Sequence, residues 1–195
     1  MLLAGAAGAE IIDRIAVTVD NEPIAQSQVM AELRMTALLN GEKPDVTAAA
    51  RRQAAGRLVE QTLIRREMQL TQYPGPGPAE VDKLVQAVDK EALKSYGVSA
   101  DELRRALERQ AAVLRFIDLR FRPEVQVTES DIRLYYDTVL VPECQKKNIA
   151  PPAYDEARSQ CEEAITGQRV DKRVDSWLSE MKARTRIRYE EDAFQ

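Results

Sequence analysis

Histidine is absent from the 195-residue chain. Its absence excludes Ser-His-Asp and Cys-His nucleophiles, histidine zinc sites and imidazole general bases, because each of them needs that side chain. Aromatic residues make up only 5% of the chain, a low share for an enzyme pocket or a β-sandwich. Chemistry based on carboxylates, lysines or tyrosines stays open, but the composition favours a protein that binds without reacting. No catalytic residue, metal ligand or cofactor is predicted.

A dominant charge of one sign and a long apolar run are absent as well. The 28 Lys and Arg residues and the 32 Asp and Glu residues give a net charge of −4 and are mixed along the chain. No nucleic-acid partner is expected, because nucleic-acid binding needs a basic face. No apolar run approaches the roughly 20 residues that cross a bilayer, so the chain is predicted to be soluble and not membrane-spanning. Glycine-rich phosphate loops and paired-cysteine metal motifs are missing too.

Residues 1–10 differ in composition from the rest of the chain. The segment from Leu2 to Ala9 is small and apolar, and its Ala-x-Ala spacings are typical of the last part of a secretory signal with its cleavage site. A disordered tail is the alternative. We therefore expect a signal-peptide remnant or disordered tail over residues 1–10, and one domain over residues 11–195.

Strand patterns occur only near the two ends of the chain. Residues 11–19 are rich in β-branched side chains that alternate, Asp20 to Pro23 supply turn residues, and residues 24–25 can return as a short partner. Residues 185–189 alternate in the same way. A strand needs a partner, so the last strand is predicted to pair with the N-terminal hairpin in a small antiparallel sheet.

Between these strands the chain is rich in strong helix formers, and the predicted fold class is mainly α. Ser27 is expected to cap the first helix, the Ser99–Glu102 capping box to open a later one, and Pro142 to end another. Gly167 marks a bend or a phase shift, because the apolar spacing slips there. The predicted helices span residues 28–40, 48–72, 79–96, 100–121, 132–140 and 154–183. The inward stripe of helix 100–121 is predicted to consist of Leu103, Leu107, Leu114, Ile117 and Phe121.

The two cysteines flank the proline-rich connection before the last helix. A Cys144–Cys161 disulfide would close a loop of about 17 residues and would add about 3 kcal/mol of stability. Export to an oxidising compartment would favour this disulfide. The alternative is a buried Cys161 and a free Cys144.

Four segments carry short motifs in a fixed order. They read IIDRIAVTVDNEPI at residues 11–24, LVEQTLI at 58–64, VTESDIRLYY at 127–136 and VDSWL at 174–178. In this order they resemble the N-terminal hairpin, the second helix, the "V-T-x-x-(D/E)-I-x-x-Y-Y" helix and the final helix of SurA-type periplasmic chaperones. The resemblance covers nearly the whole chain. It implies a helical chaperone core made of residues 11–140 together with the long helix and strand in residues 152–189.

The chain also departs from this family. SurA-type proteins carry one or more parvulin prolyl-isomerase modules between the "YY" helix and the last long helix, and their sites use histidine. A module of roughly 100 residues does not fit between Tyr136 and Tyr154. The resemblance therefore implies a peptide-binding core without isomerase activity.

The function that the resemblance implies is an ATP-independent periplasmic chaperone that holds unfolded exported or outer-membrane proteins. An assembly subunit that binds one folded partner is one alternative, and a prolyl isomerase without histidine is another. The partners expected are unfolded or extended polypeptides, and the protein is a monomer or a homodimer. The candidate client contacts are Met35, Leu38 and Leu39, which do not all fit on the inward stripe of their helix, and Tyr73 beside the proline-glycine turn.

Overall fold

The computed structural model describes residues 13–195, and its strands form one antiparallel sheet in the order β2-β1-β3. The strands are β1 (Ile15–Val19), β2 (Glu22–Ala25) and β3 (Ile187–Tyr189). Val17 of β1 lies opposite Ile24 on one side and opposite Tyr189 on the other. The predicted hairpin and its pairing with the last strand are thus confirmed. The expectation for residues 1–10 concerns a part of the chain outside the described residues.

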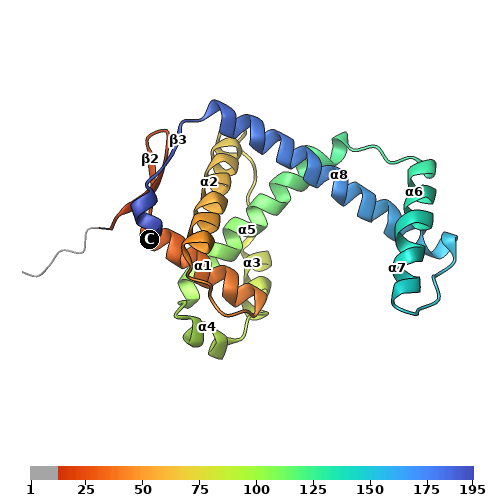
Figure 1. The fold of residues 1–195 in the computed structure, drawn as a ribbon, viewed down its shortest axis with the longest axis horizontal. Helices are drawn as coiled ribbons and strands as arrows, with labels where there is room; N and C mark the ends of the chain where they lie inside the picture. Colours follow the sequence, from red (N-terminus) through yellow and green to blue (C-terminus); the bar gives the residue numbers. More distant parts are fainter. Residues whose placement is uncertain (1–12) are drawn as a thin grey trace, which may run out of the picture.

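Helices follow the hairpin and fill most of the described chain (Figure 1). Ser99 and Glu102 form the predicted capping box, and Thr47 caps the second helix. Ser27 does not cap the first helix: its hydroxyl donates to the Asp13 carboxylate, and Gln28 accepts the N–H of Ala25, the true N-cap, at 2.7 Å. The helices are α1 (Gln26–Asn40), α2 (Ala48–Leu70), α3 (Pro78–Gln86), α4 (Lys90–Tyr96), α5 (Ala100–Phe121), α6 (Glu129–Tyr135), α7 (Val141–Lys146) and α8 (Tyr154–Arg184), with short turns η1 (Arg122–Glu124), η2 (Tyr136–Leu140) and η3 (Glu191–Phe194).

Two predicted helix boundaries are wrong. The helix expected over residues 79–96 divides into α3 and α4, because the Asp89 carboxylate accepts the Glu91 N–H at 3.0 Å and caps a new helix. Pro142 does not end the helix before it. The π-helical turn η2 comes first, and Pro142 lies in the first turn of α7, where its missing N–H is tolerated.

Within residues 13–195, three apolar clusters hold the elements together. The largest joins the sheet to α1, α2, α5, the C-terminal half of α8 and η3. A second cluster lies between α1, α4 and α5. We call these elements, with α3, the body. The third cluster consists of Ile132, Ala157, Cys161 and Ile165 and joins α6 to the N-terminal half of α8. We call α6, η2, α7 and residues 154–165 the distal lobe.

Helix α8 spans both parts, as Figure 1 shows, and is unbroken at Gly167. Its buried residues recur every four positions up to Ile165 in the distal lobe, and again from Val170 in the body. The slip of five positions between Ile165 and Val170 turns the apolar stripe to a new face. The predicted phase shift at Gly167 therefore marks the place where α8 passes from the distal lobe to the body.

Candidate functional site: an apolar groove on the body

A groove with a volume of about 860 Å³ lies among the C-terminal end of α1, α3, α5 and α8. Helix α5 supplies most of it, with Leu107, Ala111, Leu114 and Ile117 among the lining side chains. Leu39 and Leu84 come from α1 and α3, and Gly167, Val170 and Asp171 come from α8. Every apolar side chain that lines the groove is aliphatic. The size and lining are typical of sites for small or extended ligands.

The groove forms where neighbouring helices cover less and less of one apolar stripe of α5 toward its C-terminal end. Leu103 is 0% exposed, Leu107 6%, Ala111 8% and Leu114 59%. Leu103 and Leu107 pack against α1 and α4 in the second cluster. Helix α1 ends at Gly41, a left-handed residue with φ 68°. Beyond that end the stripe continues in the groove, so the prediction that Leu114 is buried is wrong.

Three of the exposed large apolar residues meet in this one place. Leu39 and Leu84 are each 39% exposed, and they line the groove with Leu114 although they belong to three different helices. Surface leucines are common singly, but leucines that converge on one concavity indicate a binding surface.

The charged residues around the groove are mostly paired with one another. Arg115 bonds to Glu80 at 3.1 Å, and Arg122 bonds to Asp118 at 2.6 Å and also to Glu163. The hydrogen bonds that Arg122 donates to Glu163 and Asp118 raise the pKa of its guanidinium above its usual range. The groove therefore has an aliphatic surface, and most of the charges around it are paired, with Asp171 as the exception among the lining residues that the structure describes.

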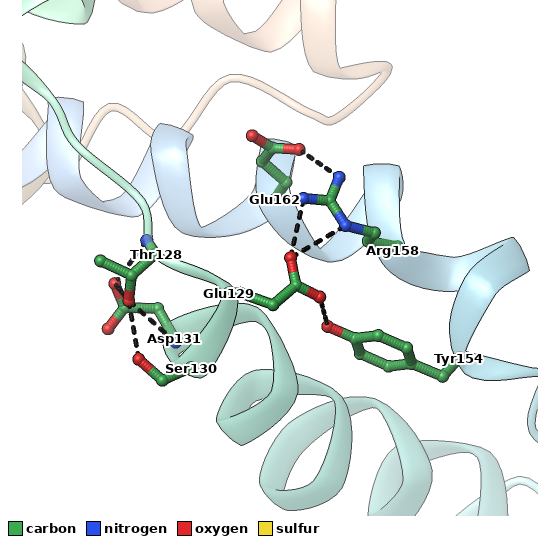
Figure 2. Close-up of polar contacts among 7 residues, drawn as sticks. All are labelled: Thr128, Glu129, Ser130, Asp131, Tyr154, Arg158 and Glu162. Carbon is green, nitrogen blue, oxygen red and sulfur yellow. Dashed lines mark hydrogen bonds and ion pairs between the residues drawn. The ribbon is translucent and has the colours of Figure 1, made fainter.

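Polar contacts between the start of α6 and the N-terminal half of α8 hold the distal lobe together (Figure 2). Arg158 donates to Glu129 at 2.8 and 3.0 Å, and the Tyr154 hydroxyl donates to the other Glu129 oxygen at 2.5 Å. These donors hold the pKa of Glu129 below its usual value. At the same helix start, Arg169 and the Thr128 N–H lower the pKa of Asp131 to about 2. We call this set of bonds the clasp.

The structure separates the four candidate client contacts. Leu39 lies in the groove. Met35 and Leu38 are buried in the second cluster, away from the surface. Tyr73 is half-buried, and its ring packs edge-on against Phe116 with centroids 5.3 Å apart. Of the four residues, only Leu39 therefore combines exposure with a place in the groove.

The sequence analysis missed the groove residues of α3, α5 and α8. Leu84 and Leu114 fit the helical period of the segments 79–96 and 100–121, and that period predicts that both face inward. The length of the α5 stripe does not reveal them, because the sequence does not show which helix covers that stripe. A stripe that is longer than its covering helix leaves leucines uncovered.

Both cysteines are free thiols in the structure. Cys161 is buried in the third cluster, where burial raises the pKa of its thiol, and Cys144 is half-buried on α7. The structure thus lacks the disulfide that the sequence analysis favoured and matches its alternative. The apolar spacing of α8 explains the difference, because it directs Cys161 into the packing between α6 and α8.

Other kinds of site find no support in residues 13–195. No group of three or more Cys, Asp or Glu side chains within that range is arranged to hold a metal ion. None of the helices described combines the length and the apolar character that a membrane span requires.

Comparisons with known proteins bear on the fold. No family model matches the chain, and no curated protein matches its sequence. Among solved structures, the chain is similar to one from a study of two related SurA-like chaperones of Campylobacter jejuni, the virulence factor PEB4 and the periplasmic protein Cj1289. The TM-score is 0.53 at 11% identity, and the match covers 90% of this chain and 98% of that chain. The chain therefore has the fold of SurA-like chaperones, as its motifs predicted.

Proposed function

We propose that the protein is an ATP-independent chaperone that holds unfolded exported or outer-membrane proteins in the periplasm. The observation that carries the proposal is the groove, in which exposed leucines of α1, α3 and α5 converge on one aliphatic concavity. The fold of SurA-like chaperones supports it. The sequence has no glycine-rich phosphate loop, so the proposed cycle uses no nucleotide.

The chemistry of the groove suits a client that is unfolded. An aliphatic surface gains free energy from any apolar side chain that it covers and demands no particular hydrogen-bond pattern. A volume of about 860 Å³ takes a short extended segment rather than a folded domain. Folded proteins have already buried most of their large apolar side chains, so an unfolded chain competes better for this surface.

The mixed surface charge suits a holding role as well. Arginines and carboxylates pair with one another at the groove rim and in the clasp. A charged surface with both signs keeps a protein with an exposed apolar groove in solution.

An aggregation assay tests the proposal. A denatured outer-membrane protein is diluted into buffer with and without the protein, and light scattering is followed, with a folded globular protein at equal mass concentration as the control. We expect scattering to fall progressively up to about one chaperone per client, without added nucleotide. Unchanged scattering at a stoichiometric excess would reject the proposal.

Two further measurements separate the alternatives. A prolyl isomerase would accelerate a proline-limited refolding reaction, which takes tens to hundreds of seconds unaided, and we expect no acceleration. An assembly subunit would retain one stable folded partner in a pull-down, whereas a chaperone retains many unfolded ones.

A further inference from the structure

Gly167 lines the groove at the middle of α8, where glycine is unfavourable. Glycine weakens a helix interior more than any residue except proline. A Cβ added at Gly167 would meet no atom within 4 Å, and its backbone is not in the left-handed region. Neither packing nor backbone geometry in the described chain therefore requires glycine at this position. Gly56 inside α2 is equally unconstrained, but of the two glycines Gly167 lines the groove, where its missing side chain lets something bound there approach the helix backbone closely.

The position of Gly167 fits such an approach. Val170 and Asp171 also line the groove, and they lie three and four residues further along the same face of α8. Because Gly167 has no side chain, the α8 backbone is accessible there, beside the apolar Val170 and the carboxylate of Asp171. A side chain that lies against this stretch contacts the α8 backbone directly.

Charge distinguishes the possible occupants of the groove. Its lining contains three acidic residues, Glu80, Asp118 and Asp171, and two arginines. Glu80 and Asp118 are paired with those arginines, whereas Asp171 forms no ion pair within residues 13–195. The groove therefore favours an apolar ligand that carries a positive charge next to its apolar part, and disfavours an anionic amphiphile.

We propose, on the basis of the function proposed above, that Gly167 and Asp171 determine which segments of unfolded polypeptide the groove accepts. A large aliphatic side chain of the segment lies over Gly167, and a Lys or Arg next to it in the segment pairs with Asp171. Both residues are binding residues of the client site.

The test compares two glycines that are equivalent except for the groove. Gly56 lies inside α2, an added Cβ there also meets nothing within 4 Å, and it does not line the groove. Gly167→Ala and Gly56→Ala are each expected to raise the melting temperature by about 2–4 °C, because alanine favours a helix. A reduced melting temperature of Gly167→Ala would show that the fold itself needs the glycine, and would overturn the proposal.

Binding is measured by fluorescence anisotropy with three labelled unstructured decapeptides. One has a central leucine between lysines, the second has alanine in place of that leucine, and the third has glutamates in place of the lysines. We expect the first peptide to bind most tightly to the wild type. Gly167→Ala is expected to weaken it at least threefold, while Gly56→Ala leaves it unchanged. Asp171→Asn is expected to remove most of the preference for lysine over glutamate.

The outcomes separate this proposal from the proposed function. If the wild type suppresses client aggregation but Gly167→Ala binds the first peptide as well as Gly56→Ala does, the proposal fails and the chaperone function stands. If the wild type suppresses no aggregation, the proposed function itself fails. Tighter binding of the glutamate peptide than of the lysine peptide would assign the groove to an anionic ligand. A wild-type dimer that Gly167→Ala dissociates and Gly56→Ala does not would assign the groove to a second copy of the chain. Either result would overturn the proposal.

Discussion

Removal of two groove leucines should weaken client binding far more than removal of two equally exposed leucines elsewhere. The variant pair is Leu84→Ser with Leu114→Ser in the groove, and the control pair is Leu70→Ser with Leu119→Ser. Leu70 and Leu119 are 81% and 53% exposed and do not line the groove. Both double variants remove the same residue types, and the control pair removes more exposed apolar surface.

The magnitude follows from the exposed fractions. Full burial of a leucine side chain contributes about 2 kcal/mol. Leu114 is 59% exposed and Leu84 is 39% exposed, so a client that covers both gains about 2 kcal/mol in total. The groove pair should therefore raise Kd by about tenfold to thirtyfold. By the same measure the two side chains together bury about one full leucine inside the folded protein, so the groove pair should also lower the free energy of unfolding by about 2 kcal/mol.

The assay is anisotropy of a labelled unfolded outer-membrane protein, titrated with each double variant after its urea midpoint has been checked. Equal losses in the two pairs would show that binding follows exposed leucine anywhere on the surface, and the groove would then not be the client site. A larger loss in the control pair would refute the reasoning outright.

Three other predictions concern stability and the thiols. Phe194 is 3% exposed and lies in the largest apolar cluster. Phe194→Ala should therefore lower the free energy of unfolding, measured in urea, by about 3 kcal/mol. An unchanged urea midpoint would contradict this place for Phe194. Glu129 and Asp131 have pKa values lowered from 4.5 and 3.8, so the clasp contributes its full stability above those values and loses it as pH falls toward about 2. The urea midpoint should drop between pH 5 and pH 2.5, and should drop less in Glu129→Gln; an equal drop would count against the clasp. Under denaturing conditions without reductant both thiols should be alkylated, and in the native protein Cys144 should react faster than buried Cys161; a mass with no adducts would reveal a disulfide.

Local signals predicted much of the fold correctly. The capping box at Ser99 and the end of the first helix at residue 40 are set by a few neighbouring residues, and both are as expected. The pairing of β1 with β3 was predictable for a different reason, because a single short hairpin at one end of a helical chain leaves an unpaired edge that another strand can cover.

The groove was not predictable, because it depends on which helix covers which. Leu114 has the same periodicity as Leu107, but Leu107 packs against α1 and α4 and is 6% exposed, whereas Leu114 is 59% exposed. Leu70 likewise fits the stripe of α2 and is 81% exposed. Hydrophobic periodicity shows which face of a helix is apolar, but it does not show where along that face the cover stops.

The central claim is that the groove holds unfolded chains, and site-specific photo-crosslinking tests it most directly. A photoreactive side chain is placed at Leu39 or Leu114 in the groove, or at Leu119 outside it. We predict crosslinks to an unfolded client from Leu39 and Leu114, almost none from Leu119, and none from any position to the same client in its folded state. Equal crosslinking from all three positions, or crosslinks to the folded client, would contradict the account.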